Sequence, residues 1–192
     1  LNTTTLAGIY KQEDTLYFMN NAWTPIGTTN APFNGRYDGN NKEINQLNVS
    51  VTGTTNAAGL FGIASSNSQL MNIIIKSGTV RGQYVAAGVA GDCGFITNCK
   101  NYANVEGTQS AGVAWNINIQ NNEISNCHNY GIIKSNGGGF CSGVFGWAFG
   151  NTIKDCTNNN VLNGFEVSGI VRNASNVQSC INNGSIVSNG SF

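Results

Sequence analysis

Charged residues are scarce in this 192-residue chain. Only 9% of its residues are Asp, Glu, Lys or Arg, and the formal net charge is zero. A nucleic-acid surface needs clustered Lys and Arg to neutralise phosphates, and a membrane-surface segment needs a basic face. No stretch approaches 18 consecutive apolar residues, so nothing in the sequence predicts a membrane-spanning helix. We therefore expect neither a nucleic-acid partner nor membrane insertion.

Other residue types are too rare for several kinds of site. The chain has one His (His128) and no Cys-x-x-Cys pair, which argues against a zinc site and a cofactor built on it. No nucleophile-elbow motif accompanies His128, so a catalytic triad is not indicated. Asn and Gly interrupt the chain so often that no window of 10 to 15 residues keeps a helical period.

Asn and Gly are the abundant residues. The chain contains 32 Asn and 25 Gly, but 40% of it is apolar and those apolar residues recur periodically. This combination favours a folded protein with many turns over a disordered one. The chain begins at Leu1 with neither Met nor a signal peptide, so we expect a processed form or an excised segment.

One skeleton recurs four times in the second half of the chain. It has an aliphatic residue, then Cys three places later, directly preceded by Asn, Asp or Ser. Asn follows two places after the Cys, and a further aliphatic residue comes after that. The Cys position, extended upstream, is filled by Leu47, Ile73, Cys99, Cys127, Cys156 and Cys180. Successive members lie 26, 26, 28, 29 and 24 residues apart, and a mean near 27 indicates a solenoid or another repeat array.

A second block recurs between these segments. It reads Ala-Gly-Leu-Phe-Gly at 58–62, Ala-Gly-Val-Ala-Gly at 87–91, Ala-Gly-Val-Ala-Trp at 111–115, Ser-Gly-Val-Phe-Gly at 142–146 and Ser-Gly-Ile-Val-Arg at 168–172. Short apolar runs with period-two spacing, bounded by Gly or Asn, are typical of strands. We predict an all-β parallel β-helix (β-solenoid) of about six coils over residues 23–192, with residues 1–22 as an N-terminal cap or irregular first coil.

In such a stack, equivalent residues lie about 4.8 Å apart in successive coils, so a buried residue contacts the equivalent residues of the coils before and after it. For the Asn two places after each Cys, two roles stay open: an inward ladder of hydrogen-bonded amides, or turn positions in the left-handed conformation. These residues are Asn101, Asn129, Asn158 and Asn182.

The cysteines are predicted to be mostly free. Stacked side chains have parallel Cβ directions and a separation too large for a disulfide, so we expect buried thiols in the column. Its members are Cys99, Cys127, Cys156 and Cys180. Cys93 and Cys141 lie outside the column, and a disulfide between them stays open.

The order of motifs from Trp23 onward resembles that of the GLUG-motif repeat proteins. The resemblance is carried by Trp-Thr-Pro-Ile-Gly at 23–27, Pro-Phe-x-Gly at 32–35, Tyr-Asp-Gly-Asn at 37–40, Ile44-x-x-Leu47 and the Ala-Gly-Leu-Phe-Gly block. Those proteins are secreted or surface β-solenoids, often adhesin-like, so the resemblance implies an extracellular or cell-surface location. The blocks at 111–115 and 168–172 depart from the motif because they lack its closing Gly.

Candidate chemistry is sparse. Carbohydrate-active β-helix enzymes need two or three carboxylates converging on one face. Beyond Glu13 and Asp14 the acids are scattered and share no repeat column, so we predict no catalytic residues. Glu106 and Lys134 occupy one column, which predicts an exposed ion pair.

Aromatic residues and sequons are the remaining candidates. Tyr102 and Tyr130 share a column and should stack; with Trp115 and Trp147 they form either a strip for sugar rings or a shield over the strands. N-glycosylation sequons occur at Asn2, Asn48, Asn173, Asn183 and Asn189.

The ends of a β-helix expose unpaired strand edges. The segment 186–192 carries no Pro, charge or helix that would cover such an edge. We expect further repeats of a longer chain, or the N-terminal region of a second copy, to continue the stack, the latter giving filaments. The predicted function is a non-enzymatic extracellular structural or adhesive element, with copies of itself, surface glycans or a host protein as partners. The alternative is a carbohydrate-active β-helix enzyme or glycan-binding module.

Overall fold

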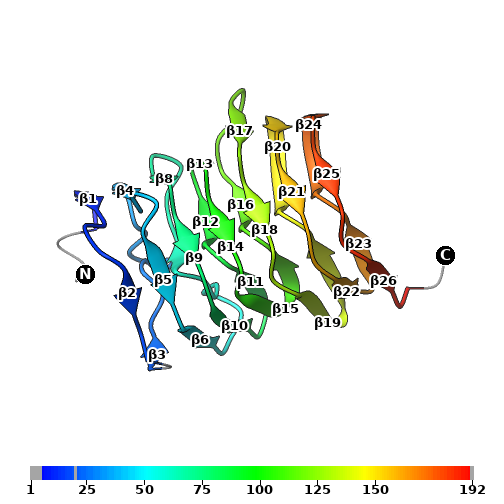
Figure 1. Ribbon diagram of the computed structural model, residues 1–192, viewed down its shortest axis with the longest axis horizontal. Helices are drawn as coiled ribbons and strands as arrows, with labels where there is room; N and C mark the ends of the chain where they lie inside the picture. The colour runs from blue at the N-terminus through cyan, green and yellow to red at the C-terminus, as the bar shows by residue number, and fades with distance from the viewer. Residues whose placement is uncertain (1–5, 20, 191–192) are drawn as a thin grey trace.

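The protein is a parallel β-helix. The computed structural model describes residues 6–19 and 21–190, and within them there are 26 strands and no helix. Every strand pair is parallel, as in the pairing of Val80 with both Val49 and Val105. In Figure 1 the coils follow one another along the longest axis from the N- to the C-terminus. The predicted all-β solenoid with a repeat near 27 residues is confirmed.

The strands form four sheets that run along the stack. The four-stranded sheet contains β1 (Ile9–Lys11), β4 (Arg36–Asp38), β8 (Gln69–Met71) and β13 (Phe95–Thr97). The seven-stranded sheet contains β2 (Leu16–Tyr17), β5 (Glu43–Asn45), β9 (Ile74–Ile75), β14 (Lys100–Asn101), β18 (His128–Asn129), β21 (Thr157–Asn158) and β25 (Ile181–Asn182).

The other two sheets are larger and partly branched. The nine-stranded sheet contains β3 (Ala22–Trp23), β6 (Leu47–Val51), β10 (Gly78–Gly82), β15 (Asn104–Ala111), β19 (Ile133–Ser142), β22 (Leu162–Gly164) and β26 (Ile186–Ser188), with β11 (Val85–Ala87) on β15 and β23 (Glu166–Ser168) on β19. The six-stranded sheet contains β7 (Phe61–Ile63), β12 (Ala90–Cys93), β16 (Ala114–Ile117), β17 (Glu123–Ser125), β20 (Phe145–Lys154) and β24 (Val171–Gln178).

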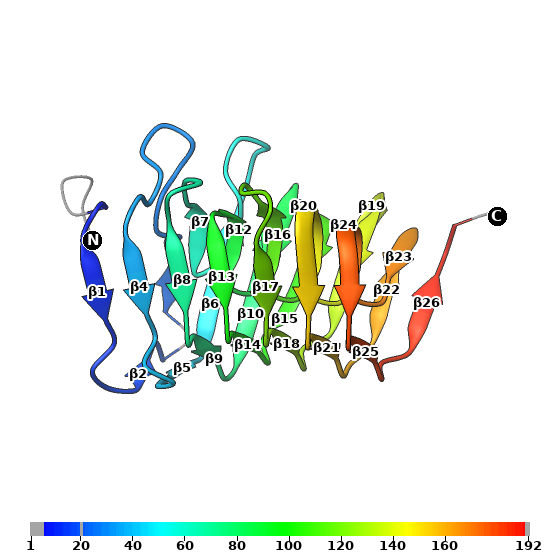
Figure 2. The ribbon, with the colours of Figure 1, turned by 90° about the horizontal axis from the view of Figure 1, so that it is seen from above.

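The four-stranded sheet is continued by the six-stranded one. Figure 2 shows β13 beside β17, and the backbone amide of Asn98 donates to the carbonyl of Ser125 at 3.1 Å. One face of the molecule is therefore continuous along the stack, although its strands belong to two sheets.

The stack has seven coils rather than about six. The seven-stranded sheet takes one strand from each coil, and its first strand, β2, pairs Leu16 with Ile44. The additional coil is formed by the segment up to Trp23, where β1 pairs with β4 and β3 pairs with β6. The sequence repeat is not visible there because none of these residues matches the Asn-Cys skeleton.

A sharp corner precedes each residue of the Cys column. Five residues there have positive φ angles between 51° and 56°: Asn72, Asn98, Asn126, Asp155 and Ser179. Asn and Asp adopt this left-handed conformation more readily than other non-glycine residues. This corner explains why Asn comes directly before Cys in the repeat.

Aliphatic columns fill the interior. The longest runs through Trp23, Val49, Val80, Val105, Ile133, Leu162 and Ile186. Its five central members are at most 1% exposed. Burial of such side chains stabilises the fold by about 1.5–3 kcal/mol each.

Leu47 does not belong to the Cys column, so that part of the predicted alignment is wrong. Leu47 pairs with Gly78, at the start of the nine-stranded sheet. Four residues separate Asp38 from Glu43, whereas two separate their partners Met71 and Ile74. The longer turn in the second coil shifts the residues after it, including Leu47, to later positions in the coil. The 26-residue spacing between Leu47 and Ile73 gave no sign of this shift in the sequence.

Four of the five glycines at the second position of the Ala/Ser-Gly block lie against the Asn residues two places after Cys. A Cβ on Gly88 would lie 2.4 Å from Cγ of Asn101, and one on Gly112 would lie 2.6 Å from Cβ of Asn129. The same relation holds for Gly143 with Asn158, at 2.7 Å, and Gly169 with Asn182, at 3.0 Å. Only hydrogen fits at this corner, which couples the two sequence blocks.

The substitution Gly112→Ala tests this contact. The new Cβ would lie 2.1 Å from the carbonyl oxygen of Gly143 as well as against Asn129, so we expect a loss of about 3 kcal/mol in the free energy of unfolding. Gly137→Ala is the control, because Gly137 has open space around it and only a strained φ of 63°, which costs about 1–2 kcal/mol. Chemical denaturation measures both. A Gly112→Ala variant as stable as the control would contradict the close contact.

Candidate functional site

The central feature of the interior is a ladder of asparagine amides, which we call the Asn ladder: Asn101, Asn129, Asn158 and Asn182. Its members lie on the strands of the seven-stranded sheet, and the first three are fully buried. Nδ2 of each donates to Oδ1 of the next, at 3.0, 2.8 and 2.7 Å along the stack. In the first three coils Leu16, Ile44 and Ile75 occupy the same column.

Each inner amide is fully hydrogen-bonded. Besides the ladder bond, Nδ2 of Asn129 donates to the carbonyl of Gly131 at 2.8 Å, and its Oδ1 accepts from the Gly131 amide at 3.2 Å. Asn101 makes the same pair of bonds with Ala103. The interpretation of these Asn residues as left-handed turn positions is wrong, because the positive-φ residues lie three places before them.

The Asn ladder has a direction. In every pair the donor belongs to the earlier coil, so the chain of amides points toward the C-terminus. At its last member, Nδ2 of Asn182 donates to the carbonyl of Gly184 at 2.9 Å. No described residue accepts its second amide hydrogen, which in the other members goes to the next Asn.

The cysteines form a parallel column of free thiols. Cys99, Cys127 and Cys156 are buried and Cys180 is half-buried. Each thiol donates to the backbone carbonyl two residues earlier, at 3.2 to 3.5 Å. Burial raises the pKa of Cys127 well above its ordinary value, which keeps the thiol protonated.

Cys93 and Cys141 are also free, so the structure does not contain the disulfide that the sequence left open. Cys93 lies on β12 and Cys141 on β19, in different sheets. Burial raises the pKa of both thiols, that of Cys141 to about 12.

The predicted stacking of Tyr102 on Tyr130 is confirmed. Their ring centroids are 4.4 Å apart and the planes differ by 7°. The ammonium of Lys76 lies 5.1 Å from the Tyr102 centroid. The ring faces therefore contact one another and Lys76, which leaves less of them for a sugar ring.

The two Trp residues do not extend this pair into one strip. Trp115 is 1% exposed and packs with Ala87 and Ala111, so it has no surface for a glycan. The room for its ring comes from Gly146, where a Cβ would lie 2.4 Å from the indole. Trp147 is exposed but lies on β20 of the six-stranded sheet, whereas the tyrosines directly follow β14 and β18 of the seven-stranded sheet. The Arg172 guanidinium lies 4.5 Å from the Trp147 ring.

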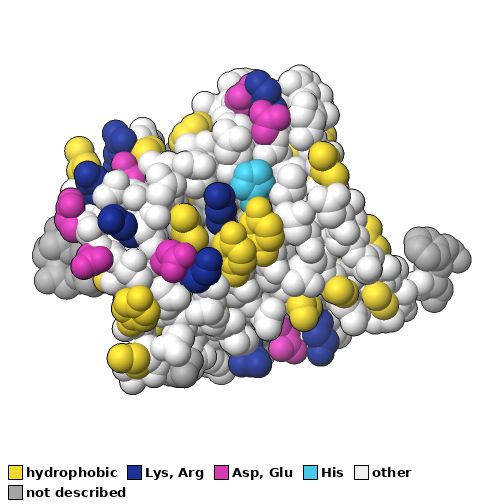
Figure 3. Space-filling model, in the orientation of Figure 1, with side chains coloured by type: hydrophobic (Ala, Val, Ile, Leu, Met, Phe, Trp, Pro, Cys, Tyr) yellow, Lys and Arg dark blue, Asp and Glu magenta, His cyan; other side chains and the backbone are white. Residues whose placement is uncertain are grey.

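The nine acidic side chains are dispersed, and four of them pair with bases. The ion pairs are Glu43–Lys76 at 3.2 Å, Glu106–Arg81 at 3.5 Å, Glu106–Lys134 at 3.7 Å, Glu123–Lys154 at 3.5 Å and Glu166–Arg172 at 3.5 Å. The predicted Glu106–Lys134 pair is thus confirmed. Figure 3 shows these charges as small mixed groups separated by uncharged surface.

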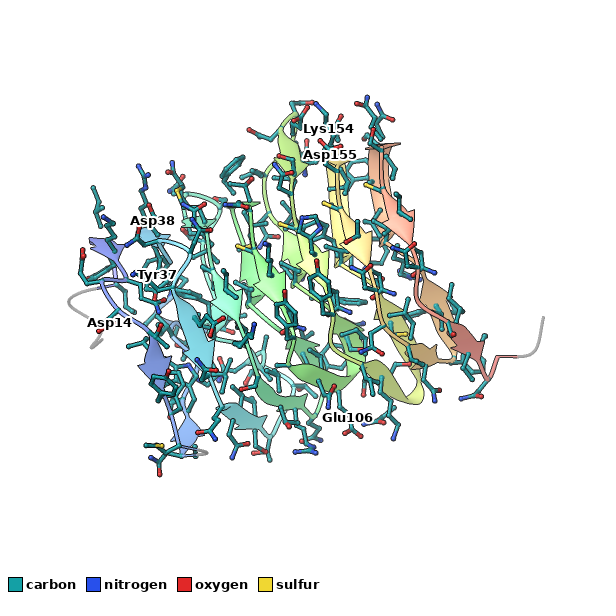
Figure 4. The ribbon with its side chains drawn as sticks, viewed as in Figure 1. Asp14, Tyr37, Asp38, Glu106, Lys154 and Asp155 are labelled. Carbon is teal, nitrogen blue, oxygen red and sulfur yellow. The ribbon has the colours of Figure 1, made fainter. Side chains whose placement is uncertain are left out.

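The acidic side chains do not converge on one face of the stack. In Figure 4 Asp14 and Asp38 lie near the N-terminal end, Glu106 lies on β15, and Asp155 lies at the end of β20. Side-chain amides donate to two of the acids: Asp38 accepts from Asn72 at 2.8 Å, and Asp92 accepts from Asn116 at 2.6 Å. Within residues 6–19 and 21–190 no group of three His, Cys, Asp or Glu side chains is arranged to hold a metal.

Both ends of the stack expose residues of the interior columns. At the C-terminal end Val177 and Ile186 are each 49% exposed, whereas their partners Ile153 and Leu162 are fully buried. At the N-terminal end a groove of about 470 Å³ opens between the first two coils. Its apolar lining includes Tyr10, Leu16, Phe18, Trp23, Ile26, Tyr37 and Leu60.

The sequons lie at different depths. Asn183 and Asn189 are exposed, and their side-chain amides donate to Asn159 and Asn163 of the preceding coil, at 2.9 and 3.1 Å. Asn48 and Asn173 are partly buried on β6 and β24. Asn2 lies outside the described residues. Glycosylation at these positions stays a prediction.

Comparison with known proteins adds no relative. No protein-family model, curated protein or solved structure matches this chain. The described residues also contain no helix long and apolar enough to cross a bilayer.

The substitution Asn129→Ala tests the Asn ladder. It removes both ladder bonds of that amide and leaves a donor on Asn101 and the backbone groups of Gly131 without partners. We expect the free energy of unfolding to fall by about 3 kcal/mol or more, since each unsatisfied buried group costs about 1–3 kcal/mol.

Asn183→Ala is the matched control, because it removes an exposed Asn–Asn bond one residue away from the Asn ladder. Its effect should stay within about 0.5–1 kcal/mol. Equal losses of unfolding free energy in the two variants, measured by denaturant titration, would show that a buried ladder amide contributes no more to stability than an exposed one.

Thiol titration tests the cysteine assignment. The denatured, unreduced protein should show six free thiols, while the native protein at pH 8 should react slowly because burial raises the thiol pKa values. Because the folded pKa of Cys141 rises from 9.0 to about 12, its contribution to stability is complete below pH 9 and is lost as the pH approaches 12. Fewer than six thiols after denaturation would contradict the assignment of all six cysteines as free.

Proposed function

We propose that this protein is a non-enzymatic β-solenoid that acts as a structural or adhesive element outside the cell or on its surface. The proposal rests on the kinds of side chain that fill the interior. The columns that face inward consist of aliphatic residues, thiols and mutually bonded amides, all of which hold one coil on the next. Such a stack is a rigid spacer whose length is set by the number of coils along its axis.

The free cysteines are compatible with this location. Secreted proteins usually oxidise their cysteines, but buried thiols with raised pKa values react slowly. The resemblance to GLUG-motif repeat proteins also supports an extracellular or surface role, because those proteins are secreted or surface solenoids.

The alternative, a carbohydrate-active enzyme or glycan-binding module, has less support. A glycosidase needs a general acid and a second carboxylate about 5–10 Å apart across a cleft. Six of the nine acids instead pair with Lys or Arg or accept bonds from Asn. For glycan binding, Tyr102 and Tyr130 cover one face of each other, and Lys76 lies over the Tyr102 ring, which leaves fewer ring faces for a sugar.

Surface labelling of intact cells that make the protein tests the location. A membrane-impermeant, amine-reactive biotin reagent should modify its exposed lysines, such as Lys76 and Lys134, without lysis, or the protein should appear in the medium. A cytoplasmic protein from the same cells serves as the control and should be labelled only after lysis. Labelling of this protein only after lysis would contradict the proposal, as would polysaccharide cleavage by the purified protein.

A further inference from the structure

The two ends of the stack differ chemically in the column of the Asn ladder. The C-terminal end presents Asn182, whose amide has one hydrogen with no acceptor among the described residues. The N-terminal end presents Leu16, which is 39% exposed and pairs with Ile44 in the coil behind it. A coil placed on one end therefore meets an amide donor, and a coil placed on the other meets an aliphatic side chain.

The surroundings of Asn182 would become buried under an added coil. Val177 and Ile186, each 49% exposed, occupy columns that are fully buried one coil earlier, and Cys180 is half-buried beside them. Covering these side chains is favourable, but it also removes water from the free hydrogen of the Asn182 amide. A buried donor without a partner is costly, so the occupant has to supply an acceptor at that point.

The stack itself shows what supplies the acceptor. The amides of Asn101, Asn129 and Asn158 each donate to Oδ1 of Asn in the next coil. We propose that the C-terminal end binds a parallel β-coil that carries Asn in the ladder column, and that Asn182 excludes the N-terminal end of a second copy. This inference rests on the proposed role as an axially stacked element and specifies which coil stacks there.

A second copy fits the apolar columns but not the amide. Continuing the parallel register would place its Leu16 on Asn182, because Leu16, Ile44, Ile75 and Asn101 share the column with Asn182. Leu has no acceptor, so the hydrogen bond that completes every inner pair is missing. A single buried Asn selects partners in coiled coils by the same mechanism.

Matched and mismatched pairs test the rule by sedimentation over a concentration series. Leu16→Asn creates an Asn–Asn pair between copies, and Asn182→Leu creates a Leu–Leu pair. Each single variant should associate end to end at about tenfold lower protein concentration than the original chain.

Leu16→Ala is the control for the N-terminal end, because it trims the same side chain without adding an acceptor, and it should not promote association. Circular dichroism checks that each variant keeps the β-sheet spectrum. The proposal is overturned if the original chain associates as strongly as the single variants, or if neither single variant gains association. All these measurements use purified protein, so their outcome is independent of the labelling result that tests the proposed location.

Discussion

The hydrogen bond between asparagine amides of successive coils is the constraint on which the rest of the structure depends. A buried amide needs both of its hydrogens and its oxygen paired, and in a parallel stack the next coil supplies what its own backbone does not. A shift of one residue would point the amides outward and the neighbouring charged or aromatic residues inward. The same bond explains the glycines at the opposite corner, since anything larger than hydrogen would collide with the ladder.

This constraint also gives the molecule a polarity. Aliphatic residues fill the ladder column in the first three coils and Asn fills it in the last four, with every donor aimed at the C-terminal end. Within the ladder column the N-terminal coils meet through hydrophobic contacts, which tolerate many partners, whereas the C-terminal coils add a directional hydrogen bond, which tolerates few. A stack with one permissive and one selective end suits a structural element that is extended in a fixed order.

The repeats were readable from the sequence because burial acts on each coil in the same way. The fold class, the repeat length, the stacked tyrosines and the Glu106–Lys134 pair all follow from column spacing alone. Other features depend on neighbouring coils. The extra residues at 39–42 moved Leu47 out of its column, and Trp115 is buried because Gly146 of the following coil makes room for it. The glycine block was visible as a repeat, but its contact with the Asn ladder crosses the core and leaves no local signal.

The exchange rates of the side-chain amide hydrogens test the central claim most directly. Nuclear magnetic resonance of ¹⁵N-labelled protein resolves the two Nδ2 hydrogens of each asparagine and measures their exchange with solvent. Those of Asn101, Asn129 and Asn158 are buried and doubly bonded, so they should exchange at least a hundredfold more slowly than those of exposed Asn183, about the factor expected when exchange requires local opening. Exchange of the three ladder amides as fast as that of Asn183 would contradict the account.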